Sequence, residues 1–65
     1  MDCGKNLKKA RENANITQEE LAMRLGVSQS AIARYESGSL IINLPTAVAM
    51  AGVLGIQVGD LVKED

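Results

Sequence analysis

Apolar residues recur along this chain at intervals of three and four positions, the spacing of one face of an α-helix. No stretch of useful length alternates polar and apolar residues, so the pattern predicts an all-α fold. The first helix is expected over residues 4–13, with Leu7, Ala10 and Ala14 on one stripe. Residues 13–15 are typical of a turn.

Start and stop signals define the next two helices. Thr17 suits the N-cap of the second helix, and Glu20 completes a capping box in which each side chain accepts from the other's backbone N–H. Gly26 ends that helix, and Ser28 caps a third that runs to about Ser37. The expected inward-facing residues are Leu21, Ala22 and Leu25 in the second helix and Ala31, Ile32 and Tyr35 in the third.

Residues 37–59 carry no charge, and these 23 positions are long enough for a membrane span. Asn43, Gln57, Pro45, four glycines and acidic flanks argue against that alternative. Asn43 suits an N-cap and Pro45 a first helical turn, which predicts a fourth helix over residues 44–54. A short fifth helix is expected over residues 58–62. The expected inward residues are Leu44, Ala47, Val48, Ala51 and Leu54, followed by Leu61 and Val62.

The composition excludes most enzymes. With 65 residues the chain makes a single domain, and with no His and one Cys it lacks the groups for most catalytic sites. Cys3 alone can form neither an internal disulfide nor a zinc site of Cys and His ligands, and we expect a reduced thiol without a role. No cofactor, metal or small-molecule ligand is implied. The N-terminus has no secretory signal, so a cytoplasmic protein is expected.

The net charge of −1 weighs against a nucleic-acid partner, because Lys and Arg contacts to phosphate dominate that affinity. The distribution is less unfavourable than the total. Up to Leu40 there are six positive and five negative charges, and after it one positive and three negative. The cations therefore gather in the first three helices.

The second and third helices carry the functional signal. A link as short as residues 26–28 prevents an antiparallel pair, so the two helices must cross steeply. Ala22 is small enough for close contact, and Val27 and Ile32 are expected to fill the angle between the helices. The outer face of the third helix is then free to protrude, as a helix does when it enters the major groove of DNA.

The stretch TQEELAMRLGVSQSAIARYESG resembles the helix-turn-helix of the lambda repressor and Cro class, also called the xenobiotic-response-element class. The small residue of that family falls on Ala22, its turn glycine on Gly26 and its packing aliphatic on Ile32. The resemblance covers about residues 5–62. It implies a five-helix lambda-repressor-like domain over residues 1–65, with the motif at 17–37 and the last two helices within 43–62.

The resemblance also implies roles for individual residues. Gln18 would brace the phosphate backbone, and the early and middle third helix would read base edges. Glutamine pairs bidentately with adenine and arginine with guanine, and each pair discriminates by about 1–3 kcal/mol. The alternative is that these are ordinary solvated helix residues. The expected base-reading residues are Gln29, Ser30, Ala33 and Arg34.

Phosphate contacts and one ion pair complete the expected site. In similar proteins an arginine of the first helix pairs with a glutamate ending the third, which implies a pair between Arg11 and Glu36. The loop SGSLIIN lacks the cations usual in the family, although backbone amides near residues 37–39 remain as donors. We therefore expect weak, dimer-dependent binding. The residues nominated for phosphate contact or bracing are Thr17, Gln18, Ser28, Lys5, Lys8, Lys9, Ser37 and Ser39. For the lysines, plain solvation is an equal alternative.

An excess of apolar residues after the third helix predicts an association surface. Leu40 and its two neighbours are too apolar for an uncovered loop, and the fourth helix has apolar residues off its core stripe where the family commonly has polar ones. A slightly apolar helix is the alternative. We expect a homodimer that sets two recognition helices about 34 Å apart. Its expected interface residues are Ile41, Ile42, Met50, Val53, Ile56 and Val58.

Together these features predict a sequence-specific DNA-binding transcriptional regulator, a repressor that occupies a pseudo-palindromic operator of double-stranded DNA as a homodimer. One alternative is a helix-turn-helix fold used as a protein-interaction or antitoxin-like module. Another is the truncated DNA-binding domain of a longer regulator. The start at Met1 and the charged end at residues 63–65 favour a complete chain.

Overall fold

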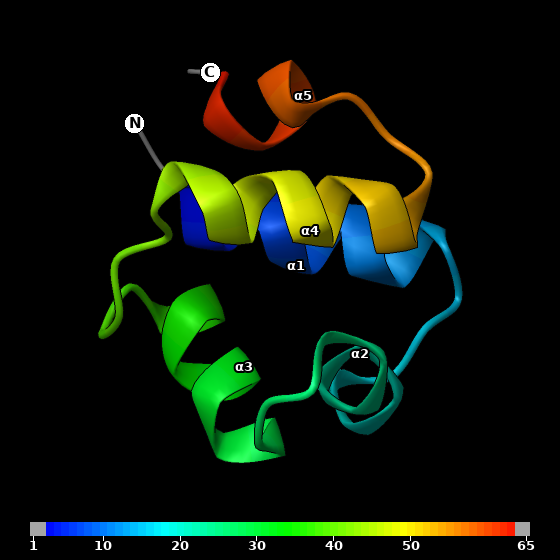
Figure 1. Cartoon of the computed structure of the whole chain (residues 1–65), viewed down its shortest axis with the longest axis vertical. Coiled ribbons are helices and arrows are strands. Elements are labelled where there is room, and N and C mark those ends of the chain that lie inside the picture. Colours follow the sequence, from blue (N-terminus) through cyan, green and yellow to red (C-terminus); the bar gives the residue numbers. More distant parts are fainter. Residues whose placement is uncertain (1–2, 64–65) are drawn as a thin grey trace.

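The computed structural model describes residues 3–63, and this part of the chain forms five α-helices and no strand (Figure 1). The helices are α1 (Cys3–Asn13), α2 (Gln18–Leu25), α3 (Gln29–Ser37), α4 (Leu44–Leu54) and α5 (Val58–Val62). Their number and order confirm the all-α prediction. Helix α2 packs against α3 and α4, while α1 packs against α3 and α5.

Side-chain caps define where three of the helices begin. The side chains of Thr17, Ser28 and Asn43 each accept from a backbone N–H three residues later, at 3.0, 3.1 and 3.0 Å. Only this half of the expected capping box forms at α2. The Glu20 carboxylate does not reach back to Thr17, because its Oε2 accepts from Arg24 Nη2 at 2.7 Å on the exposed side of the helix.

The core takes one fully buried large side chain from every helix. These five side chains, each less than 2% exposed, are Leu7, Leu21, Ile32, Met50 and Leu61. Small residues complete the buried cluster at the helix contacts, where they let the backbones approach closely. They are Ala22 in α2 and Ala47 and Ala51 in α4.

The inward face of α4 differs from the predicted one. Leu44 and Val48, expected in the core, are 67% and 53% exposed, whereas Met50, expected on the surface, is 0% exposed. The stripe of Ala47, Met50, Ala51 and Leu54 fits helical spacing as well as the predicted stripe did. Apolar residues surround α4 on every side, so its sequence pattern does not distinguish the two faces.

Two residues of α1 fix it to its neighbours. A Cβ on Gly4 would lie 2.8 Å from the carbonyl oxygen of Glu36 and closer still to that of Tyr35, so only glycine allows this approach to α3. Asn6 is buried, and its Nδ2 donates to the carbonyl oxygens of Leu61 at 2.9 Å and Lys63 at 2.8 Å. Helix α1 is therefore held between α3 and the end of α5.

The uncharged stretch is divided between the end of α3, a loop, α4 and the start of α5. Within residues 3–63, no helix is both long enough and apolar enough to cross a membrane.

Candidate nucleic-acid interface

The turn between α2 and α3 is closed by backbone hydrogen bonds. Gly26 adopts φ 72°, a left-handed conformation that favours glycine, and its N–H donates to Met23 O at 3.3 Å. The Val27 N–H donates to Ala22 O at 3.0 Å. Ile32 is 0% exposed between the helices, but Val27 is 41% exposed, so the prediction that Val27 fills this angle is wrong. The Val27 side chain instead lines a groove between α2, α3 and α4 together with Leu25 and Pro45.

The outer face of α3 presents the residues predicted to read bases. Gln29, Ser30 and Arg34 are exposed and Ala33 is half-buried, while Ile32 faces the core. Within residues 3–63, the side chains of Gln29, Ser30 and Arg34 make no hydrogen bond or ion pair. The helix therefore offers an amide, a hydroxyl and a guanidinium on one face. The contacts of these groups with DNA remain a prediction.

A buried network connects the start of α2 to the end of α3. The Glu36 carboxylate accepts from Arg11 Nε at 2.6 Å and from Arg11 Nη2 at 3.3 Å, which forms the expected ion pair. Arg11 Nη1 also donates to the carbonyl oxygen of Ile16 at 2.8 Å. The hydrogen bond that Arg11 donates to the Glu36 carboxylate is the largest cause that raises the pKa of Arg11, and burial opposes it. The guanidinium is thus charged at every physiological pH.

Gln18 belongs to the same network. Its Nε2 donates to Glu36 Oε1 at 3.0 Å, and its side chain is half-buried. Because Glu36 is already fixed by Arg11, this bond orients the Gln18 amide at the first position of α2. The sequence did not indicate this link. Gln18 is therefore positioned by α3, the helix that carries the residues predicted to read bases.

Hydroxyl groups surround the ends of α2 and α3. Thr17 and Ser28 are exposed, and each accepts from a helix N–H while its O–H proton remains available as a donor. At the end of α3, the exposed Ser37 hydroxyl donates to the carbonyl oxygen of Arg34 at 3.1 Å, and the Ser39 hydroxyl lies 3.1 Å from that of Ser37, to which it donates. The free O–H protons are therefore those of Thr17 and Ser28, and phosphate contact by any of the four hydroxyls remains a prediction.

The backbone amides after α3 donate to carbonyl oxygens of α3, whereas they were expected to be free donors to phosphate. The N–H of Gly38 donates to Tyr35 O at 3.3 Å, and those of Ser39 and Leu40 donate to Arg34 O at 2.9 and 3.1 Å. These bonds close the C-terminus of α3, because Gly38 has φ 88°. The prediction that amides near residues 37–39 are free for phosphate is therefore wrong for residues 38 and 39.

The lysines of α1 lie on different sides of the helix. Lys8 follows Gly4 by four residues and precedes Arg11 by three, so it shares the side of α1 that packs on α3. Lys9 instead lines a groove with Asp60 and Lys63 of the α5 region. Lys8 therefore lies nearer to α3 than Lys9 does, and phosphate contact by either lysine remains a prediction. Lys5 is exposed.

The residues predicted to form a dimer interface differ in exposure. Ile41 is 89% exposed and is available for contact. Ile42, Val53, Ile56 and Val58 are half-buried and pack against the core. Met50 is wholly in the core, so its assignment to the interface is wrong. Among residues 3–63, no group of three or more His, Cys, Asp and Glu side chains gathers as metal ligands do.

Known proteins share this sequence pattern. A family model described as helix-turn-helix matches residues 7–61. The chain is 37% identical over 65 residues to the immunity repressor protein of Bacillus phage phi105. The aligned region is all of this chain and 45% of the phage protein. It is 38% identical over 55 residues to the uncharacterized HTH-type transcriptional regulator MJ0272 of Methanocaldococcus jannaschii, over 85% of this chain and 83% of that protein.

A third relative has a name of another kind. The chain is 31% identical over 62 residues to antitoxin PezA of Streptococcus pneumoniae, over 95% of this chain and 39% of the relative. The chain thus spans less than half the length of the phage repressor and of the antitoxin.

Proposed function

Because the chain belongs to the helix-turn-helix family of DNA-binding regulators, in the lambda repressor and Cro class, we propose that it represses transcription by occupying a pseudo-palindromic operator as a homodimer. The observation that carries this proposal is the outer face of α3. Gln29, Ser30 and Arg34 project from it without partners among residues 3–63, and Ile32 anchors the opposite face in the core.

In this proposal α3 enters the major groove and reads base edges. Gln29 pairs with adenine, Arg34 pairs with guanine, and Ala33 contacts a thymine methyl. The Gln18 amide, fixed by Glu36, braces the phosphate backbone at the start of α2. Phosphate also meets the hydroxyls of Thr17 and Ser28 at the two helix starts, those of Ser37 and Ser39 after α3, and the ammonium groups of Lys5 and Lys8. Few of these groups are cationic, so binding by one copy is weak and depends on the second copy.

Loss of the base-reading groups tests this part of the proposal. The double variant Gln29→Ala, Arg34→Ala should bind a duplex selected from random DNA at least about 30-fold more weakly, because each bidentate pair is worth about 1–3 kcal/mol. Fluorescence anisotropy measures the affinity. Arg24→Ala is the matched control, since that exposed arginine is held by Glu20 on α2. An unchanged affinity of the double variant contradicts groove reading by α3.

The proposed dimer uses the apolar surface at the start of α4. Ile41 is 89% exposed, and Leu44 and Val48, one helical turn apart, are 67% and 53% exposed. No charge lies between residues 37 and 59, so a second copy meets no repulsion there. The surface directly follows the recognition helix. A two-fold axis through it brings two copies of α3 to one side of a duplex.

Sedimentation equilibrium tests the dimer. The unmodified chain should be dimeric at tens of micromolar, and Val48→Lys should weaken self-association at least about tenfold because an isologous interface brings the new charges together. Met23→Lys is the control, since Met23 is 74% exposed but lies on α2. A native chain that remains monomeric at this concentration contradicts the dimer.

A second candidate function is binding of a protein partner through the same apolar surface. The similarity to a protein named antitoxin PezA favours this candidate. The two functions separate in the double variant of α3. Partner binding through α4 survives loss of Gln29 and Arg34, whereas operator binding does not.

A further inference from the structure

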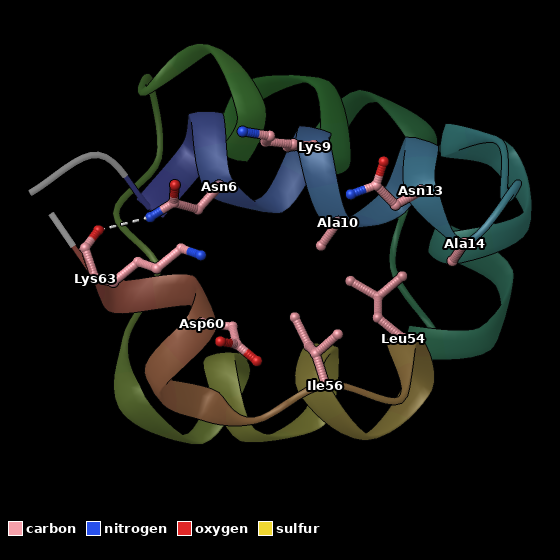
Figure 2. A pocket seen from close by; sticks show the side chains of 9 residues that line it. All are labelled: Asn6, Lys9, Ala10, Asn13, Ala14, Leu54, Ile56, Asp60 and Lys63. Atoms are coloured by element: carbon pink, nitrogen blue, oxygen red, sulfur yellow. Dashed lines mark hydrogen bonds between the residues drawn. The ribbon is translucent and has the colours of Figure 1, made fainter. Parts of the chain in front are cut away.

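A groove of about 330 Å³ opens between α1, the end of α4 and α5 (Figure 2). Asn6, Ala10 and Asn13 line it from α1, whereas Gly4 and Arg11 on another side of that helix contact α3. The groove is therefore separate from the proposed DNA contacts. Its volume falls at the lower end of the range of small-molecule sites, about 300–1,000 Å³.

The floor and the rim of this groove differ in chemistry. Ala10 and Ala14 line it on one side, and the side chains of Leu54 and Ile56 point into it from the other (Figure 2). Lys9, Asn13 and Lys63 lie around this apolar floor, and the Lys63 side chain extends across the open end towards the space between Asn6 and Asp60 (Figure 2). The groove thus combines an apolar strip with ammonium and amide donors.

Among residues 3–63, two cations and one acid line the groove. Asp60 is the acid that lines the groove, and its Oδ2 already accepts from the Gln57 N–H at 3.1 Å at the start of α5. Neither Lys9 nor Lys63 forms an ion pair within residues 3–63. The Asn6 amide is committed to the end of α5, but that of Asn13 is not. The site is therefore complementary to an anion.

We propose that this groove binds a small organic carboxylate with a short unbranched apolar chain. The carboxylate receives charge-assisted hydrogen bonds from the ammonium groups of Lys9 and Lys63 and from the Asn13 amide. The apolar chain lies along Ala10, Leu54 and Ile56. Binding connects α1 to α5 and stabilises the folded chain by mass action. This proposal does not rest on DNA binding.

The structure contains an internal control for purely apolar binding. A second groove of about 230 Å³ lies between α2, α3 and α4, where Leu25, Val27, Pro45 and Ala49 line it together with other uncharged residues. A ligand with an apolar chain and no charged group is expected to bind the two grooves equally well. In the proposed ligand, the carboxylate causes the preference for the groove between α1 and α5.

Hexanoate is the probe, and the test is an NMR titration of the full 65-residue chain labelled with nitrogen-15. We expect saturable shifts of the backbone amides of Ala10, Ala14 and Ile56, with a Kd on the order of 1 mM for a ligand of about eight heavy atoms. Hexanamide, of the same length and uncharged, should bind at least about fivefold more weakly. Shifts centred on Val27 and Ala49, or equal binding of hexanamide, would overturn the proposal.

A pair of variants assigns the anion contacts. Lys9→Gln combined with Lys63→Gln should weaken hexanoate binding about tenfold, because two partly exposed charge contacts are lost. Lys8→Gln removes the same charge on the side of α1 that packs on α3, and hexanoate affinity should remain unchanged. No saturable shift up to 20-fold above the expected Kd, or equal affinity in the double variant and the native chain, contradicts the site.

Discussion

Replacement of Glu36 by alanine removes the centre of the network beneath the proposed DNA surface. Three hydrogen bonds are lost, from Arg11 Nε at 2.6 Å, Arg11 Nη2 at 3.3 Å and Gln18 Nε2 at 3.0 Å. The Arg11 side chain is only 11% exposed and retains a bond to the Ile16 carbonyl. Breaking a buried pair by removing one partner costs about 3–5 kcal/mol. We expect a loss of about 3 kcal/mol, because the guanidinium keeps one partner.

That loss is large for a chain of this size. A domain of 65 residues is expected to have a free energy of unfolding of about 3–10 kcal/mol. A loss of about 3 kcal/mol lowers Tm by about 12–24 °C. Urea unfolding followed by far-UV circular dichroism measures the change. The hydrogen bond with Glu36 raises the pKa of Arg11 in the folded chain. The stability that the ion pair contributes is therefore complete at any pH below the ordinary pKa of arginine. It is lost only as the pH rises through the raised pKa of Arg11. The difference between the two proteins should therefore be equal at pH 7 and pH 10.

Glu20→Ala is the matched control. The Glu20–Arg24 pair is almost as short, at 2.7 Å, but the side chains of Arg24 and Glu20 are 51% and 37% exposed. An exposed pair four residues apart on a helix is worth about 0.3–0.5 kcal/mol. The loss should therefore be several times smaller than for Glu36→Ala. Equal losses in the two variants would refute the argument that burial, rather than pair distance, sets the contribution.

Further substitutions test the packing and the charge assignments. Gly4→Ala should destabilise the chain by about 1–3 kcal/mol in urea unfolding despite the better helix propensity of alanine, and a stabilised variant would contradict the close approach to α3. Met50→Ala should cost about 2–5 kcal/mol and Leu44→Ala under about 1 kcal/mol in the monomer, with the reverse order contradicting the assigned inward face of α4. Lys8→Ala should lower the log–log slope of DNA affinity against salt by about 0.9, while Lys9→Ala should leave that slope unchanged. The opposite result would assign the phosphate contact to Lys9 instead of Lys8.

The sequence predicted the helices because each start or stop has a local chemical signal. Thr17, Ser28 and Asn43 cap helices by bonds to residues three positions away, and the glycines that follow α2 and α3 adopt left-handed conformations. Such contacts depend on neighbours in the chain and need no knowledge of the fold. The ion pair of Arg11 with Glu36 was accessible only through the family resemblance, since 25 positions separate the partners.

The remaining differences arise where several arrangements satisfy the same pattern. Helix α4 is apolar on all sides, so spacing alone does not tell whether Val48 or Met50 faces the core. The hydrogen bonds that Asn6 donates to the end of α5 join positions 55 and 57 residues apart. No local sequence motif predicts such bonds. Lys9 was grouped with its neighbour Lys8 because both are cations, although adjacent helix positions point about 100° apart.

Selection of binding sites from random duplex DNA, with the native chain at physiological salt, tests the central claim most directly. The account predicts an enriched palindromic motif whose half-sites lie 10–10.5 base pairs apart from centre to centre. Repetition with Arg34→Ala should relax the preference at one guanine in each half-site. Absence of any enriched motif would contradict sequence-specific recognition by α3, and an enriched site without two-fold symmetry would contradict recognition by a homodimer.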